Sequence, residues 1–145
     1  MTVDRVLVTR KLTLIAGDLD ALAGVASTSR EAFLEDSYGQ RVAERLLERM
    51  IGRMIDVNYH LLVEQGHPPP ADYFTSFVKL ADLGVVDAAF ARRLAPAAGL
   101  RNRLVHEYEE VDPGKLFDAL GPSRTDIGEY VRAVEGYLTR IEQRP

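Results

Sequence analysis

Four polar residues close together in the sequence have the side chains needed for acid–base chemistry on a phosphate ester. Arg101, Asn102, His106 and Tyr108 lie within the stretch GLRNRLVHEYEE, residues 99–110. A histidine titrates near neutral pH, so it can take a proton from a ribose 2′-hydroxyl or give one to a leaving oxygen. An arginine supplies fixed N–H donors and a permanent positive charge as negative charge builds on the phosphoryl oxygens. Together they suit phosphodiester cleavage without a metal ion.

The other two residues have roles that fit the same chemistry. Asparagine can hydrogen-bond the phosphate or fix the imidazole, and tyrosine can stack on a base or donate to a phosphate. On a helix, Arg101 and His106 are five residues apart, about 140° around the axis and roughly 7.5 Å along it. A cleft at the helix end, or between two copies of the chain, would be needed to bring them together. A simpler interpretation is a histidine that complements the helix dipole beside surface Arg–Glu pairs.

The elements that must position these residues are predicted to be helices. Apolar residues recur every three or four positions over residues 3–26 and again over residues 37–64. The sequence GHPPP at 66–70 should end the second helix, because glycine can cap it and proline cannot continue it. Residues 73–81 indicate a short third helix that ends at Gly84.

The motif itself is expected on a fourth helix. Asp87 is its predicted N-cap, the helix should continue through residue 108, and Pro96 should kink it. Asp112, followed by proline, should then start a short helix closed by Gly121. A final helix is expected to carry the apolar positions of residues 127–141.

The fold class that follows is all-α. We expect a compact bundle of four main helices plus one or two short helices, with no sheet, because no alternating strand pattern occurs. The 145 residues suit one domain, residues 1–145, with room for a hydrophobic core.

Composition limits the other possibilities. The chain is 46% hydrophobic and 28% charged, which is typical of a globular protein. It has no cysteine, no signal-peptide pattern and no run of about 18 apolar residues, so we expect a cytoplasmic protein without a membrane span. The formal net charge of −4 means that nucleic acid would have to bind at a local basic patch.

One candidate basic patch lies on the second helix. Four arginines recur every fourth residue and would form a ridge about 18 Å long that could follow an RNA backbone: Arg41, Arg45, Arg49 and Arg53. Glu44 and Glu48 lie between them and could neutralise the ridge, so a solvated, ion-paired helix face is the favoured interpretation.

Other polar and aromatic residues have simpler interpretations. Asp56 lies on an otherwise apolar part of the second helix, where it is either a surface carboxylate or a support for Arg101 or His106. His60 and His67 lack metal-ligand spacing, and no metal site or cofactor motif is expected. Four tyrosines are most simply explained by packing: Tyr59, Tyr73, Tyr130 and Tyr137.

The motif and its surroundings resemble a known family. RNRLVHEY, residues 101–108, matches the RNxxxHxY form of the Rx4-6H motif of HEPN domains. More narrowly, MIDVNYHLL, YFTSFVKLADLGVVD and LRNRLVHEYEEVD occur in the order and at the spacing of the HepT family. That family is the toxin half of HepT–MntA toxin–antitoxin systems, and the resemblance covers nearly the whole chain.

The resemblance implies a function and a set of roles. HepT-like proteins are all-α, dimeric, metal-independent ribonucleases, so RNA would be the substrate and a second copy a partner. Arg101 and His106 would be the catalytic pair, supported by Asn102, with Asp56 allowed as a further support by the family architecture. An MntA-type nucleotidyltransferase antitoxin would attach AMP to the Tyr108 hydroxyl and silence the enzyme.

Two functional hypotheses from different classes remain open at this point. The first is a toxin ribonuclease with a composite site at a dimer cleft. The second is a non-catalytic HEPN module that binds nucleotide or serves as an adaptor for a nucleotidyltransferase. The intact Arg–His pair favours the first, and a purely structural scaffold would leave the polar cluster unexplained.

Overall fold

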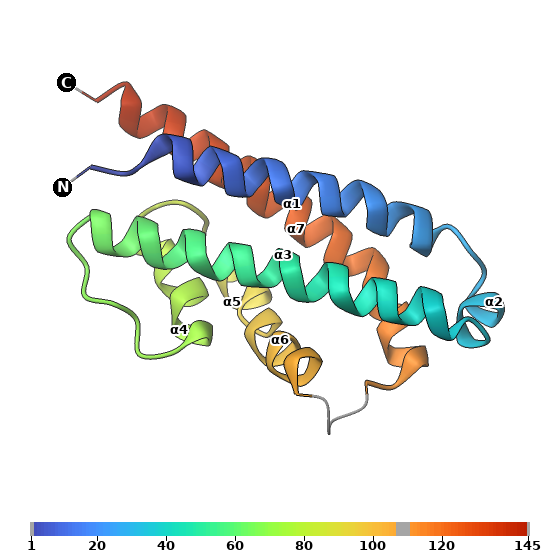
Figure 1. Cartoon of the computed structure of the whole chain (residues 1–145). Coiled ribbons are helices and arrows are strands. Elements are labelled where there is room, and N and C mark those ends of the chain that lie inside the picture. The colour runs from blue at the N-terminus through green and yellow to red at the C-terminus, as the bar shows by residue number, and fades with distance from the viewer. Residues whose placement is uncertain (1, 107–110, 145) are drawn as a thin grey trace.

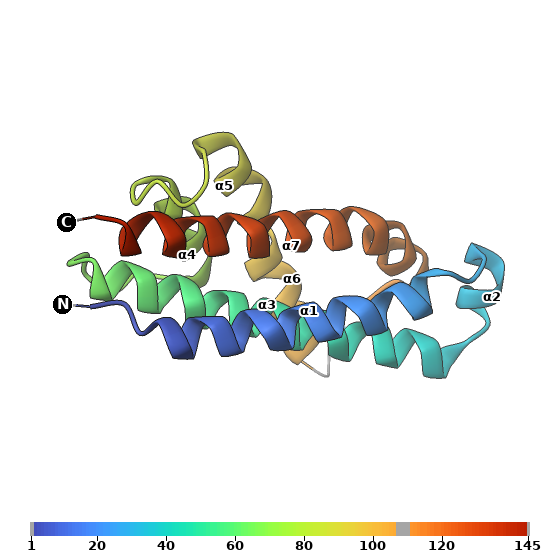
Figure 2. The same cartoon turned by 90° about the horizontal axis from the view of Figure 1, so that it is seen from above.

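Three long helices form most of the structure, which is a computed structural model that describes residues 2–106 and 111–144. They are α1 (Arg5–Ala26), α3 (Ser37–Glu64) and α7 (Pro113–Glu142). Helix α1 packs against both α3 and α7, and the three run side by side in both views (Figures 1 and 2). The described residues contain no β-strand, which confirms the all-α prediction.

Shorter helices complete the bundle. They are α2 (Arg30–Leu34), α4 (Tyr73–Val78), the 3-10 helix η1 (Lys79–Ala81), α5 (Ala88–Leu94) and α6 (Ala97–Val105). Helices α4 and α6 both pack against α3 and touch each other, below the long helices in Figure 1. This corner of the molecule, where α3, α4 and α6 meet, carries most of the predicted site.

Helix starts are fixed by side-chain caps that the sequence makes visible. The Asp87 side chain accepts a hydrogen bond from the Phe90 N–H at 2.7 Å, and Asp112 caps α7 with proline at its first position. The predicted bounds of α3, residues 37–64, are confirmed. Gly66 and Gly84 have φ values of 90° and 78°, in the left-handed region that favours glycine. Gly66 follows the end of α3, and Gly84 ends the segment after α4.

The core contains a buried polar network as well as apolar side chains. Tyr130 of α7 is fully buried, and its hydroxyl donates to the Met54 carbonyl at 3.1 Å and lies 2.6 Å from Asn58 Oδ1. Asn58 in turn donates from Nδ2 to Ser76 Oγ of α4 at 3.2 Å. The network therefore joins α7, α3 and α4 at the level of the site.

The prediction of a short helix closed by Gly121 is wrong. Helix α7 continues from Pro113 to Glu142 with Pro122 inside it. Gly121 does not have a positive φ, so it forms no left-handed cap. The buried positions Leu120 and Ile127, seven residues apart, lie on the same helical face and keep the chain helical past the proline.

The predicted fourth main helix is also interrupted more strongly than expected. Pro96 separates α5 from α6, because it has no N–H to donate into the preceding turn. Helix α6 ends at Val105, with His106 as its C-cap, and Tyr108 lies outside the described residues. The bundle thus has three long helices, with two short consecutive helices in place of the fourth. Within the described ranges, no helix is long and apolar enough to cross a membrane.

Candidate active site

Arg101 is the best-defined member of the site. Its side chain is half-buried, and its guanidinium carbon lies 5.4 Å from the centroid of the Tyr73 ring of α4, a cation–π contact. A Cβ atom added at Gly52 of α3 would lie 3.5 Å from Arg101 Nε, so α3 passes very close to the guanidinium here. Two residues distant in the sequence therefore hold the arginine in place.

The Arg101 guanidinium lines a small pocket and retains unused donor capacity. Its Nε is buried and has no hydrogen-bond partner among the described residues. The pocket has a volume of about 310 Å³ and is lined by Gly52, Ile55, Asp56, Tyr59, Tyr73 and Arg101. In the described part of the chain, no carboxylate forms an ion pair with Arg101. The permanent positive charge of a guanidinium that lines a pocket favours an incoming anion.

Asp56 is in the right pocket but has another partner. Its carboxylate lies 3.2 Å from Lys11 Nζ of α1 and is exposed. It therefore leaves the charge of Arg101 available instead of cancelling it. The prediction that Asp56 supports Arg101 stays a prediction, since the two share a pocket wall without a hydrogen bond between them.

His106 is exposed at the C-terminal end of α6. Its backbone is extended, with ψ of 111°, and its N–H donates to the Asn102 carbonyl at 3.3 Å. The Arg101 pocket does not include His106 among its described lining residues. The joint role of Arg101 and His106 therefore stays a prediction.

Asn102 lines a second pocket next to that of Arg101. This pocket has a volume of about 500 Å³ and is lined by Tyr59, Ala71, Asp72, Tyr73, Phe74, Ala98, Gly99 and Asn102. Tyr59 and Tyr73 line both pockets, and their rings meet edge-on with centroids 6.1 Å apart. Burial, with Tyr73 and Asp72 nearby, raises the pKa of the Tyr59 hydroxyl above its ordinary value, so this group stays a hydrogen-bond donor.

The basic ridge on α3 is largely paired, as the favoured interpretation predicted. Arg45 forms an ion pair with Glu48 at 3.2 Å. Arg49 and Arg53 instead reach the same carboxylate oxygen of Asp18 on α1, at 3.5 Å and 2.9 Å. Asp18 was not recognised in the sequence, because its partners lie on a helix distant along the chain.

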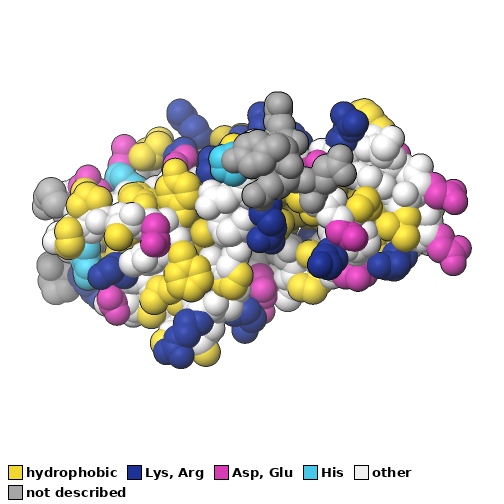
Figure 3. All heavy atoms as spheres, turned by 90° about the horizontal axis from the view of Figure 1, so that it is seen from below, with side chains coloured by type: hydrophobic (Ala, Val, Ile, Leu, Met, Phe, Trp, Pro, Cys, Tyr) yellow, Lys and Arg dark blue, Asp and Glu magenta, His cyan; other side chains and the backbone are white. Residues whose placement is uncertain are grey.

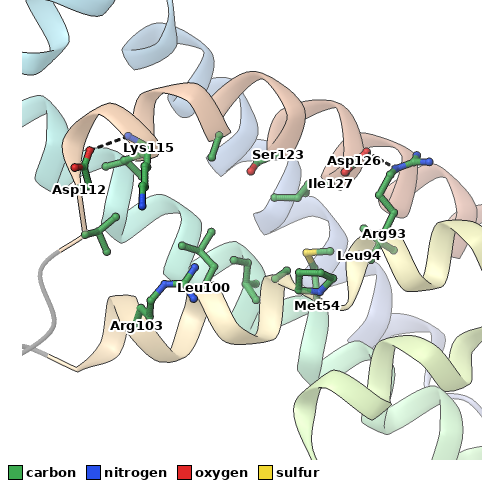
Figure 4. A pocket seen from close by; sticks show the side chains of 16 residues that line it. Met54, Arg93, Leu94, Leu100, Arg103, Asp112, Lys115, Ser123, Asp126 and Ile127 are labelled. Carbon is green, nitrogen blue, oxygen red and sulfur yellow. Dashed lines mark hydrogen bonds and ion pairs between the residues drawn. The ribbon is translucent and has the colours of Figure 1, made fainter.

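Another hollow lies between α6 and α7, and Arg101, Asn102 and His106 are not among its described lining residues. It has a volume of about 480 Å³, and Figure 4 shows Met54, Leu94, Leu100 and Ile127 around its apolar interior. Arg93 closes one end through ion pairs of 3.2 Å to Asp126 and 3.1 Å to Glu129. Seen from below, the described part of the face formed by α4, α6 and the start of α7 mixes basic, acidic and hydrophobic side chains (Figure 3).

The remaining histidines have structural explanations. His60 Nε2 accepts a hydrogen bond from the Asp4 N–H at 2.9 Å, and His67 lies in the loop after α3. Within residues 2–106 and 111–144, no group of three histidine, aspartate or glutamate side chains lies close enough to hold a metal ion. Metal independence nevertheless remains a prediction about the reaction.

Comparison with known proteins places the chain in a family. A family model described as Ribonuclease HepT-like matches residues 15–134. The chain is 32% identical over 141 residues to a protein named tRNA nuclease HepT from Aphanizomenon flos-aquae, covering 97% of this chain and 96% of that protein. The chain belongs to the HepT-like ribonuclease family.

Solved structures share the fold of this HepT-like chain. YutE from Bacillus subtilis, described as a cytosolic protein of unknown function, has a TM-score of 0.83 at 20% identity, covering 99% of this chain and 95% of that chain. A Shewanella oneidensis HEPN toxin, described as tri-AMPylated and in complex with MNT antitoxin, has a TM-score of 0.81 at 21% identity, covering 90% and 97%. At these identities the likeness shows the fold, and it confirms the predicted HEPN-like architecture.

Two residues beside Arg101 in the candidate site were not recognised from the sequence, namely Gly52 and Tyr73. For Tyr73 no sequence signal distinguishes a pocket-lining ring from a packed one, because neighbouring residues on a helix can both be buried, as Leu46 and Leu47 are. For Gly52 no local signal exists, because its role comes from the approach of Arg101, 49 residues later in the sequence.

Proposed function

We propose that this HepT-like chain is a metal-independent endoribonuclease toxin of a toxin–antitoxin pair. The observation that carries the proposal is the half-buried Arg101, which lines a pocket without a carboxylate partner in the described structure. Membership of the HepT-like family and the likeness to a tRNA nuclease support RNA as the substrate. The cytoplasm is the compartment in which RNA and a nucleotidyltransferase partner would be met.

The proposed reaction is transesterification within the RNA backbone. A neutral His106 takes the proton of the ribose 2′-hydroxyl, and the 2′-oxygen forms a bond to the adjacent phosphorus. Arg101 donates hydrogen bonds to the phosphoryl oxygens as their charge increases, with Asn102 in support. The bond from phosphorus to the 5′-oxygen breaks, and a protonated imidazole returns a proton to that oxygen. The products end in a 2′,3′-cyclic phosphate and a 5′-hydroxyl.

The proposed site is composite and lies at a dimer cleft. Arg101 is oriented toward α3 and α4, whereas His106 lies beyond the end of α6. A second copy would bring its own His106 to the Arg101 pocket of the first. The four arginines of the ridge are proposed as secondary contacts with the RNA backbone: Arg41, Arg45, Arg49 and Arg53.

Silencing is proposed to occur at Tyr108, two residues beyond His106 in the sequence. A nucleotidyltransferase antitoxin would transfer AMP from ATP to the tyrosine hydroxyl, releasing pyrophosphate. The bulky anionic product would compete with RNA phosphate for Arg101. The description of the Shewanella protein of the same fold as tri-AMPylated and bound to antitoxin supports this proposal.

The test of the reaction uses purified protein and total RNA in the presence of a chelator. We expect cleavage by the wild type, products with 2′,3′-cyclic phosphate ends, and no cleavage by His106→Ala or Arg101→Ala. Activity that disappears with chelator and returns with a divalent ion would overturn the mechanism. RNA binding without cleavage by the wild type would instead support the alternative, a non-catalytic nucleotide-binding or adaptor module.

The test of silencing is the intact mass of the chain after co-expression with its neighbouring nucleotidyltransferase. We expect mass increases in steps of one AMP in the wild type and none in Tyr108→Phe. Increases that persist unchanged in Tyr108→Phe would place the modification on another residue.

A further inference from the structure

The aromatic pocket beside Arg101 is a feature that the proposed reaction does not use. It lies where α3, α4 and α6 meet and is formed by three aromatic side chains: Tyr59, Tyr73 and Phe74. Tyr73 is 40% exposed and Phe74 is 51% exposed, so two large rings are uncovered on the same short helix. Asn102 of the motif lines the opposite wall.

The rim of this pocket is held rigidly. Asp72 caps α4 by accepting a hydrogen bond from the Thr75 N–H at 2.7 Å. Ser76 is buried, donates to the Tyr73 carbonyl at 2.6 Å and accepts from Asn58 of α3. The Tyr59 hydroxyl donates to the Pro70 carbonyl at 3.4 Å. Both sides of the rim are thus anchored, which lowers the entropy lost when a ligand binds.

Charge distinguishes this pocket from the pocket of Arg101. Asp72 is the charged side chain among its described lining residues, and no lysine or arginine lines it. A phosphate would therefore be repelled here and attracted to Arg101, on the other side of Tyr59 and Tyr73. A flat, neutral ring with N–H donors fits the aromatic pocket better, since every nucleobase has a π-face and polar edges.

We propose that the aromatic pocket binds a nucleobase of the RNA next to the phosphate held by Arg101. The proposal rests on the ribonuclease function and adds a substrate site to it. The base stacks on the Phe74 ring, and the Asn102 amide, which has both a donor and an acceptor, hydrogen-bonds its edge. The shared Tyr73 ring then links base binding to the position of the guanidinium.

The first experiment uses the absence of tryptophan from the chain. Phe74→Trp introduces a single tryptophan into the pocket, and Tyr38→Trp, at a position 78% exposed and outside both pockets, is the matched control. Mononucleotides and ribose 5-phosphate are titrated against each variant. We expect saturable quenching of Phe74→Trp by mononucleotides alone and no saturable response of Tyr38→Trp. An equal response to ribose 5-phosphate would overturn the base site.

The second experiment measures affinity in a protein that cannot cleave. In a His106→Ala background, Phe74→Ala should weaken binding of single-stranded RNA roughly five- to a hundredfold, the range measured when a stacking aromatic is removed. Phe74→Tyr should restore it. Circular dichroism checks that each variant is folded. Unchanged RNA affinity in folded Phe74→Ala would contradict the proposal.

Further outcomes distinguish base binding from a protein contact of the exposed rings and from the proposed ribonuclease reaction. If Phe74→Ala converts a dimer into a monomer without changing mononucleotide binding, the exposed rings contact a protein and the base site is wrong. If the wild type cleaves RNA but Phe74→Trp shows no quenching, the aromatic pocket fails while the ribonuclease function stands. Quenching of Phe74→Trp by mononucleotides, without any RNA cleavage by the wild type, would support the nucleotide pocket and contradict the proposed reaction.

Discussion

At the scale of single residues, the proposed chemistry depends on the small number of groups that contact the Arg101 guanidinium. The guanidinium rests on the Tyr73 ring and beside the bare backbone of Gly52, with its Nε unbonded among the described residues. An arginine paired with a carboxylate would offer less to an incoming phosphate. The types and order of the motif residues could be predicted from the sequence. The two contacts that position Arg101 could not, because they join residues 28 and 49 positions away.

Substitutions at Gly52 should separate stability from activity. Gly52→Ala places a methyl group at ordinary contact distance, 3.5 Å from Nε, and should raise the free energy of unfolding by about 0.5–1 kcal/mol through helix propensity. Gly52→Leu should fill the pocket, displace the guanidinium and lower cleavage on the order of 100-fold in a folded protein. Urea unfolding and RNA cleavage measure the two effects. Full activity in Gly52→Leu would contradict this view of the site.

A pH dependence should arise from Tyr130 in the core. Burial raises the pKa of its hydroxyl well above the ordinary value of 10.0, with a smaller contribution from Asp56. Below pH 10 the group is neutral in both states, so its contribution to stability is fully present. As pH rises above 10, the hydroxyl ionises in the unfolded chain before it ionises in the folded protein. The free energy of unfolding therefore decreases until the pH reaches the higher pKa of the folded state. We therefore expect the urea midpoint to decrease between pH 10 and pH 11.

The variant Tyr130→Phe isolates that contribution. It should lower the free energy of unfolding at pH 8 by about 1–2 kcal/mol, since Asn58 Oδ1 loses a buried partner. It should also reduce the loss of stability above pH 10. Tyr38→Phe, at a position 78% exposed, is the control and should leave the value at pH 8 unchanged. An identical alkaline loss in Tyr130→Phe and wild type would exclude Tyr130 as the cause.

At the scale of elements, the sequence predicted helix starts correctly at capping aspartates, but it did not predict correctly what each proline does to a helix. Asp87 and Asp112 cap helices as predicted, and α3 has the predicted bounds. Pro96 separates two helices, whereas Pro122 lies inside one. Buried positions recur beyond both prolines, at Ala98 and at Ile127, so hydrophobic periodicity alone does not distinguish the two cases.

Pro122 should therefore cost stability. It lies in the exposed part of α7 and removes one backbone hydrogen bond from the helix interior. Pro122→Ala should raise the free energy of unfolding by about 1–3 kcal/mol, as measured by urea denaturation. Pro113→Ala is the matched control and should give no gain, because proline is favoured at the first helical position. Destabilisation by Pro122→Ala would show that α7 requires the proline.

The Asp18 contact between α1 and α3 allows a test of the basic ridge. Asp18→Asn removes the carboxylate that Arg49 and Arg53 share, and should lower the free energy of unfolding by about 1–3 kcal/mol. If the ridge follows an RNA backbone, the freed cations should also tighten RNA binding and increase its salt dependence. Binding measured in a His106→Ala background at two salt concentrations decides this. Unchanged RNA affinity would show that the ridge is structural.

At the scale of the whole molecule, the predicted architecture is confirmed while its assembly stays a proposal. The all-α fold follows from helical periodicity, which extends over most of the chain, and the HEPN-like arrangement was expected from the family resemblance. A dimer cannot be inferred from periodicity, since a helix face that packs on a second copy has the same pattern as one that packs on its own core. The proposal of a second copy rests on the Arg101 pocket, which has no His106 among its described lining residues.

Mixing two inactive variants should reveal such a composite site. If Arg101 of one copy works with His106 of the other, a heterodimer of Arg101→Ala and His106→Ala contains one intact pair. Subunit exchange at micromolar concentration should then restore part of the RNA cleavage that each variant alone has lost. Sedimentation of the same mixture confirms that dimers form. No recovery in a mixture that has exchanged subunits would place both catalytic groups within one copy.

The approach of Arg101 to Gly52 has a consequence for the genetics of a toxic copy. A single nucleotide change in a glycine codon can give valine, aspartate, arginine or another larger residue. Each would alter the Arg101 pocket from its α3 wall and leave the sequence of the motif unchanged. Under the proposed function, a cell selected for survival without its antitoxin should accumulate changes at codon 52 as well as at the motif. The resulting proteins would still fold, still bind the antitoxin and no longer harm the cell.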